Sequence, residues 1–268
     1  DLFRTVTAGD DLELDAVVDP LIEQCWQIPT QMRGSLQPGC ERPAVAGSPE
    51  SKQPGCKSRG KTWFDVERTL RIQHPFDGSW GYQATGFFSI DARYGNPFQL
   101  MSLIDRLHQA GIGTILDFAP VHFAKDKWAL AEYDGTKLFE YSNKWRVSPW
   151  GSLQFDLGKD PVRSFLMSAM NYFIDYFHFD GLRVDAVSNI IYYNGDVSNG
   201  VNEGAVEFIK RLNGKIHIAH DSVMMIAEDS TAFAGTTKPT EQGGLGFDYK
   251  WDLGWMNDTL KYYSKDPV

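Results

Sequence analysis

The sequence predicts an α/β fold built around a parallel sheet. Three short, apolar, β-rich segments occur at residues 113–120, 179–187 and 223–227, and segments of helical length separate them. Strands separated in this way are typical of right-handed βαβ units, which wind into a barrel or into an open doubly wound sheet. No Gly-x-Gly-x-x-Gly motif follows a strand, which argues against the nucleotide-binding form of the open sheet.

The expected helices follow from capping residues and apolar spacing. The first begins after Asn96, with a proline in its first position, and ends at Gly111. A second opens at Asp160, again followed by proline, and a third begins at Asn202. A fourth is expected around residues 254–263. These helices supply the crossovers that a parallel sheet requires.

The first 71 residues differ in character from the rest of the chain. About half of residues 34–60 are Gly, Pro or Ser, and no apolar period persists there. We therefore divide the chain into residues 1–71, an irregular segment without an assigned fold, and residues 72–268, the α/β part.

Each of the three predicted strands ends in a carboxylate. Asp117 ends the first, Asp185 the second and Glu228 the third. Because the carboxyl ends of parallel strands converge on one face, which in barrels holds the active site, these acids are expected to meet. They could be structural partners of arginines, ligands of a divalent metal, or the paired acids of glycoside chemistry.

Arg183 helps to decide between these roles for the three acids. It lies two residues before Asp185, so in a strand both side chains point to the same face. A guanidinium there would repel a metal dication, whereas beside a nucleophile it lowers the carboxylate pKa and keeps the group ionised. The pattern favours a double displacement in which Asp185 attacks the anomeric carbon and Glu228 acts as acid and then base. This chemistry needs no cofactor and no metal, and we expect none.

Five segments carry a resemblance to a known family. They are HPFDGSWGYQATGFFSIDARYG (74–95), DFAPVHF (117–123), DGLRVDAVSNIIY (180–192), AEDST (227–231) and GGLGFDYKWDLGWMNDTL (243–260). Together they resemble the 1,4-α-glucan branching enzymes of the α-amylase superfamily, glycoside hydrolase family 13. The resemblance implies that residues 72–268 are an incomplete (β/α)8 TIM barrel, a piece of a catalytic domain.

The resemblance also implies a reaction. Asp185 would be the nucleophile and Glu228 the acid/base of a retaining transfer that cleaves an α-1,4-glucan and passes the segment to a 6-hydroxyl. The products would be the α-1,6 branches of glycogen or starch. Two alternatives stay open: an amylase-like hydrolase, and an inactive glucan-binding fragment. The family's later His–Asp pair would lie beyond Val268, so we expect this chain alone to be nearly inactive.

The same resemblance assigns four substrate-binding residues. Arg183 and His122 would contact the sugar at the catalytic subsite, and Asp117 would support the site. Tyr82 would stack on that sugar or hydrogen-bond to it.

Composition limits the partners. The formal net charge of −9 argues against nucleic acid, which needs basic patches, and suits a neutral α-glucan polysaccharide such as glycogen, amylose or amylopectin. No apolar run approaches the ~20 residues of a membrane span, so no membrane partner is expected. The three cysteines are few and odd in number, which is typical of a reducing compartment, and we expect a cytoplasmic protein.

Overall fold

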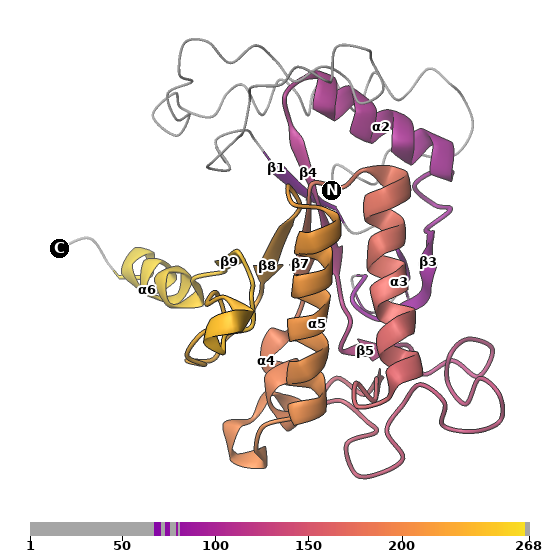
Figure 1. The fold of residues 1–268 in the computed structure, drawn as a ribbon, viewed down its shortest axis with the longest axis vertical. Coiled ribbons are helices and arrows are strands. Elements are labelled where there is room, and N and C mark those ends of the chain that lie inside the picture. The colour runs from indigo at the N-terminus through magenta and orange to yellow at the C-terminus, as the bar shows by residue number, and fades with distance from the viewer. Residues whose placement is uncertain (1–66, 71–72, 76–78, 80, 266–268) are drawn as a thin grey trace.

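The computed structural model describes residues 67–70, 73–75, 79 and 81–265. Its centre is a five-stranded sheet in the order β1-β4-β7-β8-β9, and all four strand pairs are parallel. These strands are β1 (Glu67–Leu70), β4 (Gly113–Phe118), β7 (Gly181–Val184), β8 (Met224–Ala227) and β9 (Tyr249–Lys250). Their carboxyl ends therefore share one edge of the sheet (Figure 1).

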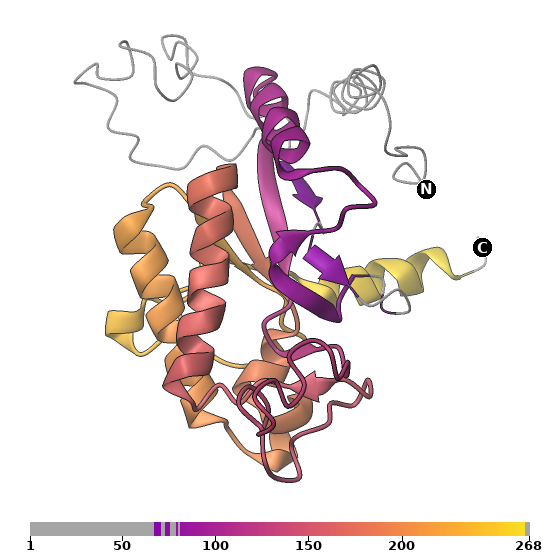
Figure 2. The same cartoon turned by 90° about the vertical axis from the view of Figure 1, so that its right-hand side faces the viewer.

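The longer helices cover one face of this sheet. Helix α3 (Asp160–Phe177) and helix α5 (Glu203–Ala219) contact each other and run side by side in both views (Figures 1 and 2). Helix α2 (Pro97–Gln109) packs on β4 and on α3, and the short α4 (Val187–Ile191) packs on α5. Helix α6 (Leu253–Tyr263) extends away from the sheet (Figure 2).

The four predicted helices are confirmed, and the two asparagine caps that the sequence indicates are present. The Asn96 side chain accepts the backbone N–H of Gln99, and the Gln99 side chain accepts the N–H of Asn96, which is a complete capping box. Asn202 caps α5 by accepting the N–H of Ala205. These contacts satisfy N–H groups that have no partner inside the helix.

Several short elements have no counterpart in the sequence prediction. Strand β1 lies before residue 72, outside the segment predicted to be α/β, yet it pairs with β4 over four residues. The others are the hairpin of β2 (Gln73–Pro75) and β3 (Ala84–Ile90), the pair β5 (His122–Phe123) and β6 (Leu153–Gln154), strand β9, helix α4, and the 3-10 turns η5 (Tyr193–Gly195), η6 (Val197–Asn199) and η7 (Thr240–Gln242). Residues 1–66 of the predicted irregular segment lie outside the described residues.

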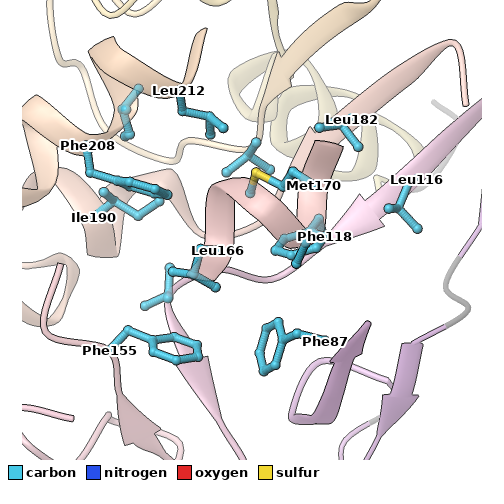
Figure 3. Packing of buried hydrophobic residues seen from close by; sticks show 14 of the residues in the cluster. Phe87, Leu116, Phe118, Phe155, Leu166, Met170, Leu182, Ile190, Phe208 and Leu212 are labelled. Carbon is cyan, nitrogen blue, oxygen red and sulfur yellow. The ribbon is translucent and has the colours of Figure 1, made fainter. Parts of the chain in front are cut away.

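Alternation along the strands separates an apolar layer from the layer of acids. On β4, Leu116 and Phe118 are fully buried in the core that the sheet shares with α3 and α5. Figure 3 shows them beside core residues that include Leu182 of β7 and Met170 of α3. Each such side chain contributes about 1.5–3 kcal/mol when it is removed from water. The intervening positions face the other side of the sheet, where Ile115, Met224 and Ile226 form a second small apolar cluster. Asp117 lies on that side near the end of β4, and Asp185 and Glu228 directly follow β7 and β8.

In the described part of the chain, no helix is both long enough and apolar enough to cross a membrane.

Candidate active site

Two neighbouring strands place Arg183 against a pair of aspartates. Asp117 of β4 and Arg183 of β7 are direct partners in the strand register. The NH1 atom of Arg183 donates to Oδ1 of Asp117 at 2.6 Å and to Oδ1 of Asp185 at 2.6 Å. The Asp117 and Arg183 side chains are almost completely buried, so this is an interior ion pair at the carboxyl end of the sheet.

Glu228 joins the same guanidinium from the next strand. Its Oε2 lies 3.8 Å from NH2 of Arg183, and the same oxygen accepts the backbone N–H of Ala186 at 2.8 Å. Ala186 has a left-handed backbone, with φ of 51°, where the chain turns from β7 into α4. This turn places the N–H beside the end of β8. The carboxylates of Asp185 and Glu228 are therefore held around one arginine.

Tyr82 reaches this cluster from the segment before β3. Its hydroxyl donates to Oδ2 of Asp117 at 3.4 Å and accepts from NH1 of Arg183 at 3.4 Å. The sequence-predicted residues Tyr82, Asp117, Arg183, Asp185 and Glu228 are thus brought together in one connected set.

The electrostatic balance at Asp185 differs from the simple expectation. Burial raises its pKa from 3.8 to about 6, and the charges of Asp117 and Glu228 also raise it. The Arg183 guanidinium lowers the pKa, as expected from the sequence, but it does not outweigh burial. The expected effect of Arg183 is therefore present, but the overall pKa of Asp185 still lies above its ordinary value, and the group is mainly ionised at neutral pH.

His122 contacts a different set of side chains. Among the described residues, its Nδ1 bonds to the hydroxyl of Ser152 at 3.0 Å, and Ser152 bonds in turn to Ser148. Its ring lies 4.9 Å from the ring of Trp150. Burial lowers the pKa of His122 to about 4, so the imidazole is neutral at physiological pH.

No protein-family model matches the chain. Curated relatives match about three quarters of it. The chain is 46% identical over 214 residues to the 1,4-alpha-glucan branching enzyme GlgB of Cutibacterium acnes, which covers 75% of the chain and 33% of that protein. It is 50% identical over 208 residues to GlgB 1 of Clostridium perfringens, covering 73% and 31%. It is 51% identical over 205 residues to GlgB of Geobacillus stearothermophilus, covering 75% and 32%.

Over about three quarters of its length, the chain is homologous to 1,4-α-glucan branching enzymes. It spans about a third of the length of the curated relatives it matches. A crystal structure of an α-amylase from Geobacillus thermoleovorans, in complex with acarbose, aligns with 62% of the chain and 37% of that protein, with a TM-score of 0.51 and 17% sequence identity. This likeness concerns the fold: the described part is an incomplete (β/α)8 barrel of the α-amylase type.

The site also contains a residue that sequence reasoning did not single out. The ring centroid of Trp251 lies 4.4 Å from the guanidinium carbon of Arg183, while the Tyr82 ring lies 5.7 Å from it. Both distances allow a cation–π interaction. Trp251 directly follows β9 within the segment that resembles the family, and an aromatic residue at a strand end is the signal that could have identified it.

Asp229, the acid next to Glu228, has a structural environment. Its buried carboxylate accepts hydrogen bonds from the backbone N–H and hydroxyl of Thr231, the hydroxyl of Thr236 and the ammonium group of Lys250. It therefore holds the loop after β8 together.

Within the described residues, no group of three or more His, Cys, Asp or Glu side chains is arranged to hold a metal ion. The site instead contains two carboxylates, those of Asp185 and Glu228, which lie at the ends of adjacent strands and have different surroundings. A carboxylate that can attack and a carboxyl group that can exchange a proton are the two requirements of a retaining glycosyl transfer.

Proposed function

We propose that this chain carries the nucleophile and the acid/base of a 1,4-α-glucan branching enzyme. The observation that supports this most directly is the shared guanidinium: Arg183 lies 2.6 Å from Asp185 and 3.8 Å from Glu228. Two carboxylates held at one cation, on neighbouring strand ends of a parallel barrel, can act on the same glycosidic bond.

The reaction divides into two steps. In the first, an Asp185 oxygen forms a bond to the anomeric carbon, the α-1,4 glycosidic bond breaks, and Glu228 gives its proton to the departing oxygen. In the second, Glu228 takes the proton of an acceptor 6-hydroxyl, whose oxygen bonds to the anomeric carbon as the ester to Asp185 breaks. Two inversions at the same carbon retain its configuration, and the product is an α-1,6 branch.

The surrounding residues hold the reacting groups. Arg183 keeps Asp185 in place and favours its ionised form. Asp117 and Tyr82 fix the arginine through NH1, and the tyrosine ring is available to the sugar at the cleavage site. The neutral ring of His122, with Nδ1 occupied by Ser152, would offer Nε2 to a sugar hydroxyl.

Transfer is favoured over hydrolysis because the three relatives above are named branching enzymes. The substrates proposed are α-1,4-glucans such as amylose, amylopectin and glycogen. A cytoplasmic location is proposed as well, supported by the few and odd-numbered cysteines.

Covalent labelling tests the nucleophile in a protein that contains this chain, because the chain alone is expected to be nearly inactive. A 5-fluoro-α-glucosyl fluoride carries a good leaving group and forms a glycosyl ester that hydrolyses slowly. We expect mass spectrometry to find the added sugar on the peptide that contains Asp185, and Asp185→Asn to abolish it. Asp258→Asn, an exposed position on α6, is the matched control and should label normally. A label on any other residue contradicts the proposal.

Branching is tested separately, in a protein that contains this chain and acts on amylose. Loss of iodine staining without new reducing ends supports transfer. Rising reducing ends would instead indicate an amylase-like hydrolase.

A further inference from the structure

Three hydrogen bonds tie Glu228 to β7 and to the turn that follows it. Its backbone N–H donates to the carbonyl oxygen of Val184 at 2.9 Å, and its own carbonyl oxygen accepts the N–H of Val187 at 2.8 Å. Oε2 of its carboxylate accepts the N–H of Ala186 at 2.8 Å. All three partners lie on one side of β8, which stands between β7 and β9 in the sheet (Figure 1). These bonds leave the course of the chain after Glu228 to contacts on the other side.

Lys250 of β9 supplies contacts on that other side. It stands opposite Ala227, the residue before Glu228, in the register of β8 and β9. Its ammonium group donates to Oδ2 of Asp229 at 2.9 Å and to the carbonyl oxygen of Thr231 at 2.5 Å. One side chain of β9 thus holds the first and the third residue that follow the proposed acid/base.

The burial of Asp229 makes its contact with Lys250 important for the loop after β8. The Asp229 side chain is completely buried, and in the part of the chain that the structure describes, Lys250 is the cation that pairs with it. The same carboxylate accepts hydrogen bonds from Thr231 and Thr236 of the loop. A buried carboxylate without a counter-charge is strongly unfavourable, so the ion pair fixes the loop against β9.

The chemistry proposed for Glu228 depends on where its carboxyl group points. A proton passes between a carboxyl group and a reacting oxygen only within hydrogen-bond reach, and a displacement of about 1 Å can cost about a hundredfold in rate. The direction of a side chain follows the backbone on both sides of it. We propose that Lys250 is a positioning residue, which holds the backbone after Glu228 and thereby directs the acid/base toward the glycosidic oxygen. This inference rests on the proposed function and adds a residue to it.

Lys250 is expected to act on only one of the two reacting groups. Asp185 is held from the side of β7, because Arg183 donates to its carboxylate at 2.6 Å and its own N–H donates to the carbonyl oxygen of Phe118 at 2.9 Å. Neither contact involves β9. The loss of Lys250 should therefore impair proton transfer at Glu228 while the nucleophile keeps its place.

The leaving group of the substrate separates these two effects. Fluoride departs without a proton, so the labelling of Asp185 by 5-fluoro-α-glucosyl fluoride needs the nucleophile and depends little on Glu228. A sugar oxygen departs with a proton, so transfer from amylose needs both groups. Both rates are measured in a protein that contains this chain and acts on amylose.

Lys250→Met keeps the aliphatic length of the side chain and removes its charge. We expect it to slow transfer from amylose by about a hundredfold and to leave the rate of labelling within about twofold of the wild type. Glu228→Gln is the reference and should separate the two rates in the same way. Lys261→Met, at an exposed position of α6, is the matched control and should change neither rate.

A double variant distinguishes positioning from the neutralisation of a buried charge. Lys250→Met combined with Asp229→Asn leaves no unpaired charge, and asparagine can still accept from Thr231, but the link from the loop to β9 is lost. The double variant should therefore recover thermal stability relative to Lys250→Met and still transfer slowly from amylose. It also carries the test if Lys250→Met alone does not fold.

The outcomes separate the two proposals. If Glu228→Gln slows transfer alone, and a folded Lys250→Met slows both rates equally or neither, the positioning role is wrong and the proposed function stands. If the double variant transfers from amylose at the wild-type rate, the lysine only neutralises Asp229 and the positioning role is again wrong. If Glu228→Gln does not separate the two rates, the acid role of Glu228 fails, and with it the proposed function. Circular dichroism establishes that each variant is folded before its rates are compared.

Discussion

Arg183 and Asp185 stand two positions apart at the end of β7, and NH1 of the arginine lies 2.6 Å from Oδ1 of the aspartate. Despite this contact, burial brings the pKa of Asp185 to about 6. The protein thus keeps its proposed nucleophile charged at neutral pH against a desolvation cost. A group that folding holds in an unfavourable state should reveal itself in the dependence of stability on pH.

Asp185→Asn should stabilise the chain at neutral pH. A raised folded pKa contributes stability that is complete below the unfolded value near 3.8 and is lost as pH rises through about 6. The ionised group therefore costs on the order of 3 kcal/mol at pH 7.5, and asparagine cannot ionise. Thermal unfolding should show a higher Tm for the variant than for the wild type at pH 7.5, and no such gain at pH 4.

Asp258→Asn is the control for this comparison, since its side chain is exposed on α6. Its Tm difference from the wild type should not change sign between the two pH values. A variant at position 185 that gains stability only at acid pH would contradict the assignment.

His122 should titrate far below an ordinary histidine. Burial lowers its pKa to about 4, whereas a hydrogen bond to Asp180, 2.8 Å away, raises the pKa of His108. NMR titration of the histidine ring protons should therefore give one midpoint near 4 and another above 6.5. Because the folded pKa of His122 is depressed, its contribution to stability is present above pH 6.5 and is lost as pH falls through about 4.

Replacing either histidine assigns its signal, and the pH dependence of stability gives a second measurement. His122→Gln should make the chain less sensitive to acid between pH 6.5 and 4. A midpoint for His122 near 6.5 would show that its ring is open to water and would remove the basis for treating it as neutral.

Lys159 organises the long connection that precedes α3. Its ammonium group donates to the carbonyl oxygens of Lys137, Leu138 and Glu140, at 2.7, 3.2 and 3.1 Å. Lys159→Met keeps the aliphatic length and leaves these acceptors without their donor, so the free energy of unfolding should fall by about 1–3 kcal/mol. Urea denaturation measures this change. Lys215→Met, at an exposed position of α5, should leave the unfolding midpoint unchanged.

Gly244 is needed for the loop that leads into β9. A Cβ atom at this position would stand 1.9 Å from the carbonyl oxygen of Lys238, which is far inside van der Waals contact. Gly244→Ala should therefore lower the free energy of unfolding by more than about 2 kcal/mol, because backbone must move. Gly214→Ala is the matched substitution: nothing lies within 4 Å, and alanine in α5 should stabilise by about 0.5–1 kcal/mol. Equal effects of the two substitutions would contradict the packing described for the loop.

Much of the scaffold could be predicted because its signals are local. Asn96 and Asn202 mark helix starts through hydrogen bonds made within one turn, and β4 and β7 are apolar enough to be recognised alone. The edge strands β1 and β9 could not be predicted, because they are short and their β structure depends on a neighbour to pair with.

The residues of the site also divide into those that the local sequence predicts and those that it does not. Asp185 and Glu228 follow predictable strands, so their residue types and their spacing along the chain are informative by themselves. The contact of Trp251 with Arg183 depends on the register of β9, and the pKa of Asp185 depends on how much water the folded chain excludes. Neither this contact nor this pKa can be predicted from the local sequence.

The carboxylate of Glu228 accepts a hydrogen bond from the backbone N–H of Ala186, on the turn that directly follows Asp185. The spacing between the two reacting groups therefore depends on the peptide framework of adjoining strands as well as on Arg183, which lies close to both carboxylates. A change in the turn that follows β7 would therefore displace both reacting groups at once.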